Sequence, residues 1–265
     1  MLWIIRGVRG VIFFSLLLAS CEMVIFRIEG EVVDINGEPL PGVCVSSSQT
    51  FDYAITDAKG KFYFTSLKPV SKIDLIKSDY LPIRIELTQM QNAKVNLGKI
   101  TLVLKPFTQG VYYYDRLSKR YIMLSYSQVK RVKFEENIFL PSVARNEIVK
   151  VKVSPLTLYV YKMPHYDVKL YRMKLVDLKI DKSGEGKLKD KTEKEEQSQV
   201  FVPDEPVMVH TRFISMVDNT LFIIEPLREL EPGYYCINWG AFETPFPKIP
   251  DNYLFEYEDE SNEEK

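Results

Sequence analysis

The stretch "DINGEPLPGVCVSSS", Asp34 to Ser48, places a turn dipeptide, two prolines and a second glycine between two apolar runs. Asn36-Gly37 is a strong hairpin signal, because both residues tolerate a positive φ. The prolines that follow lack a donor for a sheet ladder and therefore belong at a sheet edge. Val43 and Val45 are two residues apart and should face one core. The stretch predicts a tight turn, an edge segment and a short strand.

Similar signals recur on both sides of this stretch. "FRIEGEVVD" alternates apolar and charged residues before the turn, and "AITDAKGKFYF" predicts two strands joined by a turn at Asp57–Gly60. "IDLIKSDYLPIRIEL" and "VNLGKITLVL" add further short apolar runs. Together these runs predict six or seven strands within Ile25–Leu104.

The order of these motifs resembles the carboxypeptidase regulatory-like domain, a transthyretin-like β-sandwich. The resemblance rests on "GEVVDINGEPLPGVCV", "AITDAKGKFYFTSL", "SDYLPIRIEL" and "VNLGKITL" and covers roughly residues 25–105. One departure is Ser78-Asp79-Tyr80, where the family usually has a glycine before the aromatic residue. The resemblance implies a non-catalytic module without a zinc site, of a kind widespread in bacterial surface proteins.

The first twenty residues have the pattern of an export signal. Arg6 and Arg9 precede an apolar run, Val11–Leu18, that is too short to span a bilayer. "LASC", ending at Cys21, resembles the bacterial lipobox, which implies cleavage before Cys21 and a diacylglyceryl group on its thiol. The alternative is an ordinary secretory signal with a cysteine near the cleavage site. We expect residues 1–20 to be a lipoprotein signal peptide and the mature protein to be anchored to the cell membrane or outer membrane.

The remainder of the chain predicts a second all-β domain, either a sandwich or a barrel, over residues 111–257. We expect residues 106–110 to be a linker after a first domain of residues 21–105. The stretch "GVYYYDRLSKRYIMLSY" predicts a hairpin with its turn at Asp115–Lys119. The other strand-like runs are Val129–Phe134, Ile148–Val153, Leu156–Met163, Val168–Ile180, Val207–Met216, Leu221–Glu225 and Tyr234–Trp239.

Three local features complete this half of the chain. The apolar phase slips between Leu170 and Met173, which predicts a bulge there. Ser142–Glu147 predicts a short helix, with Ser142 as its N-cap. Residues 181–199 are dense in Lys, Glu and Asp and read as a solvated, disordered loop, and residues 258–265 form an acidic tail.

Composition and motifs exclude several classes of function. The formal net charge of −1 gives no basic excess for nucleic acid. H-E-x-x-H, C-x-x-C, G-x-S-x-G and P-loop patterns do not occur in the sequence. The two histidines, His165 and His210, lack a second His or Cys at ligand spacing. We therefore expect a protein that is not an enzyme and has no metal site and no cofactor.

Two sets of residues remain as candidate sites. Cys44 and Cys236 could form a disulfide in an oxidising compartment, although two separate thiols are the preferred interpretation. Tyr112, Tyr114 and Trp239 lie on expected strands and could form an aromatic platform for a sugar or peptide. Ordinary strand packing is the alternative, and we favour it because Tyr is a good strand residue.

The sequence thus predicts a lipid-anchored envelope protein of two β-rich domains. Its expected role is structural or in protein–protein contact, with a membrane as one partner through the lipid. The alternative is a carbohydrate-binding module that recognises cell-wall or extracellular glycan.

Overall fold

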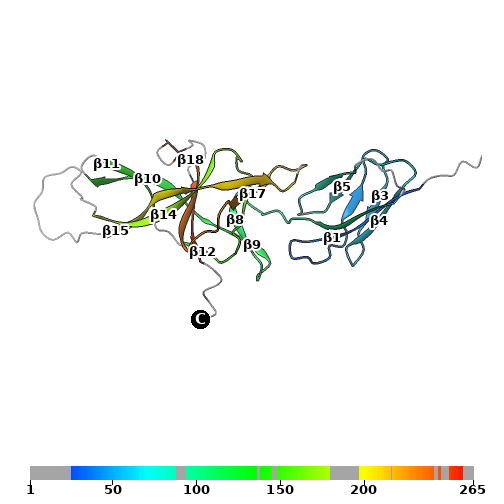
Figure 1. The fold of residues 1–265 in the computed structure, drawn as a ribbon, viewed down its shortest axis with the longest axis horizontal. Coiled ribbons are helices and arrows are strands. Elements are labelled where there is room, and N and C mark those ends of the chain that lie inside the picture. The colour runs from blue at the N-terminus through cyan, green and yellow to red at the C-terminus, as the bar shows by residue number, and fades with distance from the viewer. Residues whose placement is uncertain are drawn as a thin grey trace, which may run out of the picture.

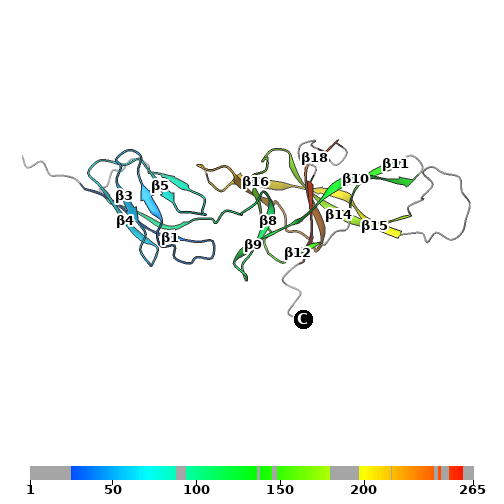
Figure 2. The same cartoon turned by 180° about the vertical axis from the view of Figure 1, so that it is seen from behind.

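The computed structural model describes residues 25–87, 94–135, 138–144, 148–179, 197–215, 217–241, 244–245 and 251–258. Every regular element in these residues is a β-strand, so the predicted all-β class is confirmed. The signal segment with Cys21, most of the charged segment 181–199 and the tail beyond residue 258 lie outside the described residues. Figure 1 shows two β-rich bodies arranged end to end, and Figure 2 shows the same arrangement from behind.

The first body, which we call the N-terminal sandwich, consists of two sheets. The strand order β4-β1-β7 makes a three-stranded sheet in which β7 is parallel to β1, and β3-β2-β5-β6 makes an antiparallel sheet of four strands. The strands are β1 (Phe26–Val33), β2 (Cys44–Ser46), β3 (Tyr53–Ile55), β4 (Lys61–Ser66), β5 (Lys72–Ile76), β6 (Ile83–Glu86) and β7 (Lys94–Thr101).

Alternation along these strands builds a single core between the two sheets. On β4 the exposed and buried residues alternate strictly, which is the pattern of a strand with one solvated face. Phe62 and Phe64 of one sheet pack with Val45, Ile73 and Leu75 of the other, and all five are completely buried. The prediction that Val43 and Val45 face the core is confirmed.

Two turns of the same design shape one end of this sandwich. In the first, the Asp34 carboxylate accepts hydrogen bonds from the backbone N–H groups of Asn36 and Glu38, both at 2.8 Å. In the second, the Asp57 carboxylate accepts from the N–H groups of Lys59 and Lys61, both at 2.9 Å. Each turn ends on a glycine with positive φ, as the sequence predicts.

The second body, which we call the C-terminal unit, contains the remaining thirteen strands in two sheets. The order β16-β17-β13-β8-β9 makes a five-stranded sheet, and β12-β20-β10-β11-β15-β14-β18-β19 makes an eight-stranded one. The strands are β8 (Gly110–Asp115), β9 (Arg120–Met123), β10 (Ser125–Glu135), β11 (Ile138–Ala144), β12 (Val149–Val151), β13 (Leu158–Tyr161), β14 (Val168–Lys179), β15 (Gln197–Val207), β16 (Val209–Phe213), β17 (Leu221–Pro226), β18 (Gly233–Ala241), β19 (Thr244–Pro245) and β20 (Asp251–Tyr257).

An additional pairing of β20 with β18 closes part of the larger sheet. The cycle of antiparallel neighbours runs β18-β14-β15-β11-β10-β20 and returns to β18. The main core of the unit lies between this ring and the five-stranded sheet, and it includes Leu158, Phe222, Ile237, Trp239 and Phe255.

Several local predictions for this unit are confirmed and one is wrong. Strands β8 and β9 form the expected hairpin, and the pairing of β14 with β15 shifts register between Arg172 and Met173, where a bulge was predicted. The helix expected at Ser142–Glu147 is incorrect, because residues up to Ala144 continue β11. Pairing with β10 along this hairpin overrides the local helix signal. Gly110, assigned to the linker, already belongs to β8.

Candidate interaction surfaces

The aromatic residues proposed as a ligand platform are buried. Tyr112 and Tyr114 are 5% and 7% exposed, and Trp239 is 1% exposed. The Trp239 indole N–H donates to the carbonyl of Pro164 at 2.7 Å. Because these rings offer no face to a ligand, the platform interpretation is wrong, and the strand-packing alternative describes these side chains.

The tyrosines of β8, β9 and β13 form an edge-to-face cluster instead. The Tyr121 ring centroid lies 5.2 Å from that of Tyr114 and 5.2 Å from that of Tyr159. Burial, followed by the neighbouring Tyr159 and Tyr114, raises the pKa of the Tyr121 hydroxyl above its ordinary range. This cluster is a rigid packing element of the kind aromatic pairs favour.

Cys44 and Cys236 are both free thiols. Cys44 lies partly exposed on β2 of the N-terminal sandwich, and Cys236 is fully buried on β18 of the C-terminal unit. Burial raises the pKa of the Cys236 thiol well above its ordinary value. Because both thiols are free and lie in different bodies, the disulfide alternative is wrong and the preferred interpretation of two separate thiols is confirmed.

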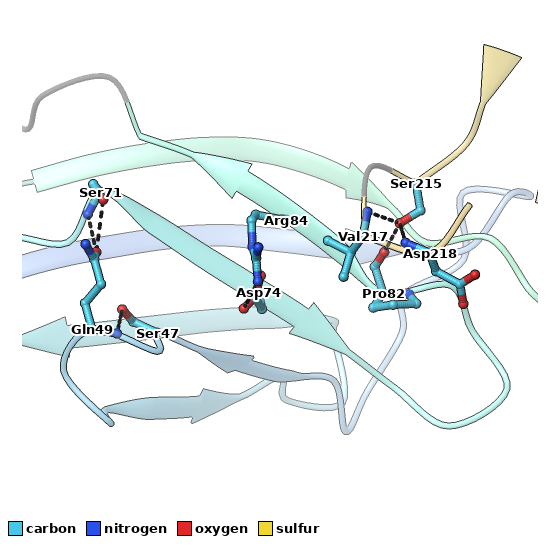
Figure 3. Close-up of polar contacts among 9 residues, drawn as sticks. All are labelled: Ser47, Gln49, Ser71, Asp74, Pro82, Arg84, Ser215, Val217 and Asp218. Carbon is cyan, nitrogen blue, oxygen red and sulfur yellow. Dashed lines mark hydrogen bonds and ion pairs between the residues drawn. The ribbon is translucent and has the colours of Figure 1, made fainter. Parts of the chain in front are cut away.

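A polar joint connects the two bodies. The Lys105 ammonium lies 3.2 Å from the Asp218 carboxylate. The Asn36 side-chain amide donates to the Tyr114 hydroxyl at 3.0 Å, which ties the first Asp34 turn to β8. The Ser215 hydroxyl donates to the Pro82 carbonyl, a contact visible in Figure 3. These contacts come from segments far apart in sequence, so the two bodies meet through a specific surface and not only through the chain between them.

An apolar cluster lies beneath these polar contacts. It joins Leu81 and Val103 of the N-terminal sandwich to Tyr112, Tyr161 and Leu221 of the C-terminal unit. Leu81 and Leu221 are completely buried. Apolar burial between two bodies favours a fixed relative orientation. We call the polar and apolar contacts together the interdomain joint.

The outer face of the sheet β3-β2-β5-β6 in the N-terminal sandwich carries exposed apolar side chains. Ile55, Cys44 and Ile76 are aligned across three neighbouring strands, with Ile55 60% and Ile76 50% exposed. In the next row the Arg84 guanidinium donates to the Asp74 carboxylate at 2.7 Å and 3.0 Å, as Figure 3 shows. That hydrogen bond raises the pKa of Arg84.

The edge of this sheet at β3 has free hydrogen-bonding groups. The Thr56 N–H donates to the Val43 carbonyl at 3.0 Å, and the Ser47 N–H donates to the Asp52 carbonyl at 3.2 Å. In an antiparallel ladder, hydrogen-bonded and non-hydrogen-bonded pairs alternate, so these two bonds determine which residues of β3 bond to β2. The N–H and C=O groups of Tyr53 and Ile55 therefore point away from β2. Among the described residues β3 pairs with β2 alone, so this edge can accept a further strand.

Grooves elsewhere are shallow and show mixed charge. One of about 370 Å³ lies beside the loop before β18, between the Arg172–Glu231 ion pair and Met208. Another, of about 320 Å³, crosses the outer face of β1 above Gly30.

No group of three or more His, Cys, Asp or Glu side chains within the described residues is placed to hold a metal ion. The described part of the chain also has no helix that could cross a bilayer.

Comparisons with known proteins give weak structural likeness only. No family model and no curated protein matches the chain. A streptococcal ancillary pilin is 12% identical with a TM-score of 0.23, covering 89% of this chain and 59% of its own. A type II cohesin–X–dockerin complex from Acetivibrio cellulolyticus is 18% identical with a TM-score of 0.26, covering 29% of this chain and 56% of that one.

The major pilin subunit of Bacillus cereus is a further match, at 9% identity and a TM-score of 0.22, covering 88% of this chain and 67% of that one. The chain spans less than two thirds of the length of the streptococcal pilin and the cohesin complex chain that it matches. At these scores the matches carry no argument about function, and the all-β class rests on the strands of the chain itself.

Proposed function

We propose that this protein is an exported, lipid-anchored, non-catalytic component of the cell envelope. In this proposal the N-terminal sandwich lies against the membrane, and the interdomain joint holds the C-terminal unit away from it. The observation that carries the proposal is the direction of β1. Its last residue, Val33, leads into the Asp34 turn at the joint, so Phe26 lies at the opposite end.

The distance from the anchor to the first strand supports this arrangement. Phe26 follows Cys21 by five residues, which span about 17 Å when extended. A lipid on Cys21 would keep the sandwich close to the bilayer, while the end-to-end arrangement in Figure 1 would direct the C-terminal unit outward. The protein would serve as a short, stiff spacer.

The test is mass spectrometry of the natively produced mature protein. We expect the chain to begin at Cys21 and to carry a diacylglyceryl thioether, and we expect a Cys21→Ala variant to be absent from the membrane fraction. An unmodified Cys21 thiol in a freely secreted product would overturn the proposal.

The edge of β3 supports a protein-contact role for the spacer. An extended segment of a partner protein, with apolar side chains at alternate positions, would pair with the outward groups of Tyr53 and Ile55. A second copy on the same membrane does not fit. Symmetric pairing of two edges is antiparallel, and β3 runs along the axis of the molecule, because β5 leads to Pro82 at the joint. The paired copies would then point in opposite directions.

A photo-crosslinking residue in place of Tyr53 tests this contact in cells. Ile55→Pro removes the outward N–H of β3 and leaves the inward ladder with β2 intact. We expect one discrete adduct at position 53 that Ile55→Pro abolishes, and none from the same probe at Tyr63, which is 67% exposed on the other sheet. Adducts that persist in the Ile55→Pro background would contradict strand addition.

A further inference from the structure

Three exposed apolar side chains lie at the end of the N-terminal sandwich that is opposite the joint. Phe51 is 90% exposed, Leu67 is 62% exposed and Ile25 is 44% exposed. Phe26 pairs with Ser66, so Ile25 and Leu67 extend from neighbouring strands at the same end. We call Ile25, Phe51 and Leu67 the apolar tip.

The loop that carries Phe51 is held at this end by a side-chain bridge. The Gln49 side-chain carbonyl accepts hydrogen bonds from the Ser71 N–H at 2.8 Å and from the Ser71 hydroxyl at 3.1 Å. Figure 3 shows this bridge at one end of the sheet and the Ser215–Pro82 contact at the other. The bridge joins the loop after β2 to the loop before β5, so Phe51 and Leu67 belong to two loops that are fixed to each other.

The backbone conformation and the exposure of Phe51 are both unfavourable for a sandwich surrounded by water alone. Its φ is +60°, a conformation that costs free energy for a bulky residue. The backbone N–H of Phe51 donates to the backbone carbonyl of Ser47 at 3.1 Å, which holds Phe51 in this turn. The same turn leaves the ring almost completely exposed. Strain combined with exposure of a large apolar ring indicates a binding role in which the ring is covered.

The charges beside the tip favour an anionic surface. Arg27 and Lys68 are exposed residues next to Ile25 and Leu67, and Lys94 is paired with Arg27 across β1 and β7. Lys94 also contacts Glu29 at 3.1 Å, so Arg27 and Lys68 are the two exposed cations that flank the apolar side chains in sequence. Asp52 is the one carboxylate in the described loop that carries Phe51, and it is only partly exposed.

We propose that the apolar tip enters the headgroup region of the membrane that holds the Cys21 lipid. This inference rests on the proposed lipid anchor. Ile25 follows Cys21 by four residues, so extended chain allows about 14 Å between them. Apolar rings and aliphatic side chains rimmed by Lys and Arg are the composition that lies at a bilayer interface. The tip would then set the orientation of the whole spacer, which a flexible lipid tether alone would not.

Tryptophan quenching in vesicles tests the proposal on the full lipidated protein. After signal cleavage Trp239 is the single native tryptophan, and it is buried in the C-terminal unit. The Phe51→Trp variant is placed in vesicles of phosphatidylglycerol and phosphatidylethanolamine with brominated acyl chains. If position 51 reaches the boundary of headgroups and acyl chains, we expect the added emission to fall in brominated vesicles relative to the same vesicles without bromine. Trp239 emission should be unchanged.

Leu117→Trp is the matched control, because Leu117 is 96% exposed but lies in the turn after β8, away from the tip. We expect no quenching at position 117. Equal quenching at positions 51 and 117, or none at position 51, would overturn the proposal.

A second preparation separates this inference from the anchor itself. The mature chain with Cys44→Ser is coupled through Cys21 to a maleimide lipid, which supplies a tether whether or not the cell attaches one. Quenching at position 51 in this preparation supports the tip even if mass spectrometry finds no natural lipid. A natural lipid without quenching at position 51 in either preparation leaves the anchor standing and excludes the tip.

Discussion

Lys105 and Asp218 form an ion pair across the interdomain joint, with 3.2 Å between the ammonium nitrogen and the carboxylate oxygen. Both side chains are partly exposed, so a contribution of about 0.2–1 kcal/mol to the free energy of unfolding is expected. Asp218→Asn should lower the unfolding free energy by that amount in urea titrations. Asp204→Asn breaks the more exposed pair with Lys174 and is the control. An equal loss in both variants would contradict a specific role at the joint.

The same pair predicts a pH dependence of stability. Burial alone would raise the pKa of Asp218, but the Thr220 hydroxyl and N–H, together with Lys105, outweigh it and hold this pKa below its ordinary value. A carboxyl group with a lowered folded-state pKa contributes stability above its unfolded pKa, near 3.9. That contribution is lost as the pH falls through the folded value. The stability difference between the wild type and Asp218→Asn should therefore be constant above about pH 5 and shrink below pH 4.

Leu81 should couple the unfolding of the two bodies. Leu81 is completely buried in the apolar cluster of the joint, so Leu81→Ala should cost about 2–4 kcal/mol. Because the lost contacts join the two bodies, calorimetry should show a single unfolding transition in the wild type and two in the variant. Leu117→Ala, at a 96% exposed position, should show the same calorimetric profile as the wild type. A single transition in Leu81→Ala at a lowered temperature would mean that the coupling lies elsewhere.

The turns and the short strands could be predicted from the sequence, because their signals are local. Asn36-Gly37, the turn at Asp57–Gly60 and the slip near Met173 each depend on residues within a few positions. The pairing of β20 with β18 and the extent of β11 depend on partners far along the chain. No local pattern at Ser142 distinguishes a helix N-cap from a strand in a long hairpin.

The burial of the tyrosines on β8 shows the same limit. Alternation places Tyr113 on one face and Tyr112 and Tyr114 on the other, and the second face was a candidate surface. Tyr113 does pack in the main core of the C-terminal unit. Tyr112 is covered by the joint cluster with Leu81, and Tyr114 by Asn36. Leu81 and Asn36 belong to the N-terminal sandwich, so the burial of this face depends in part on how the two bodies meet, which periodicity within one strand does not contain.

Gly60 should be far less tolerant of substitution than Gly37, although both end an Asp-x-x-Gly turn with positive φ. A Cβ at Gly60 would lie 2.3 Å from the Val32 carbonyl oxygen, whereas a Cβ at Gly37 would meet no atom within 4 Å. Gly37→Ala should therefore cost about 1 kcal/mol through its conformation alone. Gly60→Ala should lower the free energy of unfolding by considerably more than that, because the backbone at Val32 or at position 60 must move to make room for the Cβ. Urea unfolding of the two variants compares them, and equal losses would contradict the close packing of Gly60 against β1.

Thiol counting should distinguish all three cysteines of the chain. Cys44 is partly exposed, whereas Cys236 is fully buried and burial raises its pKa, so its reactive thiolate is suppressed. If Cys21 carries the proposed lipid, the protein without reductant should react with one equivalent of a thiol reagent when native and with two when denatured. Cys44→Ser should remove the native reaction and leave one thiol on denaturation. A Cys44–Cys236 disulfide would abolish reaction in both states, and an unmodified Cys21 would add one thiol to each count. The two failures therefore change the counts in opposite directions.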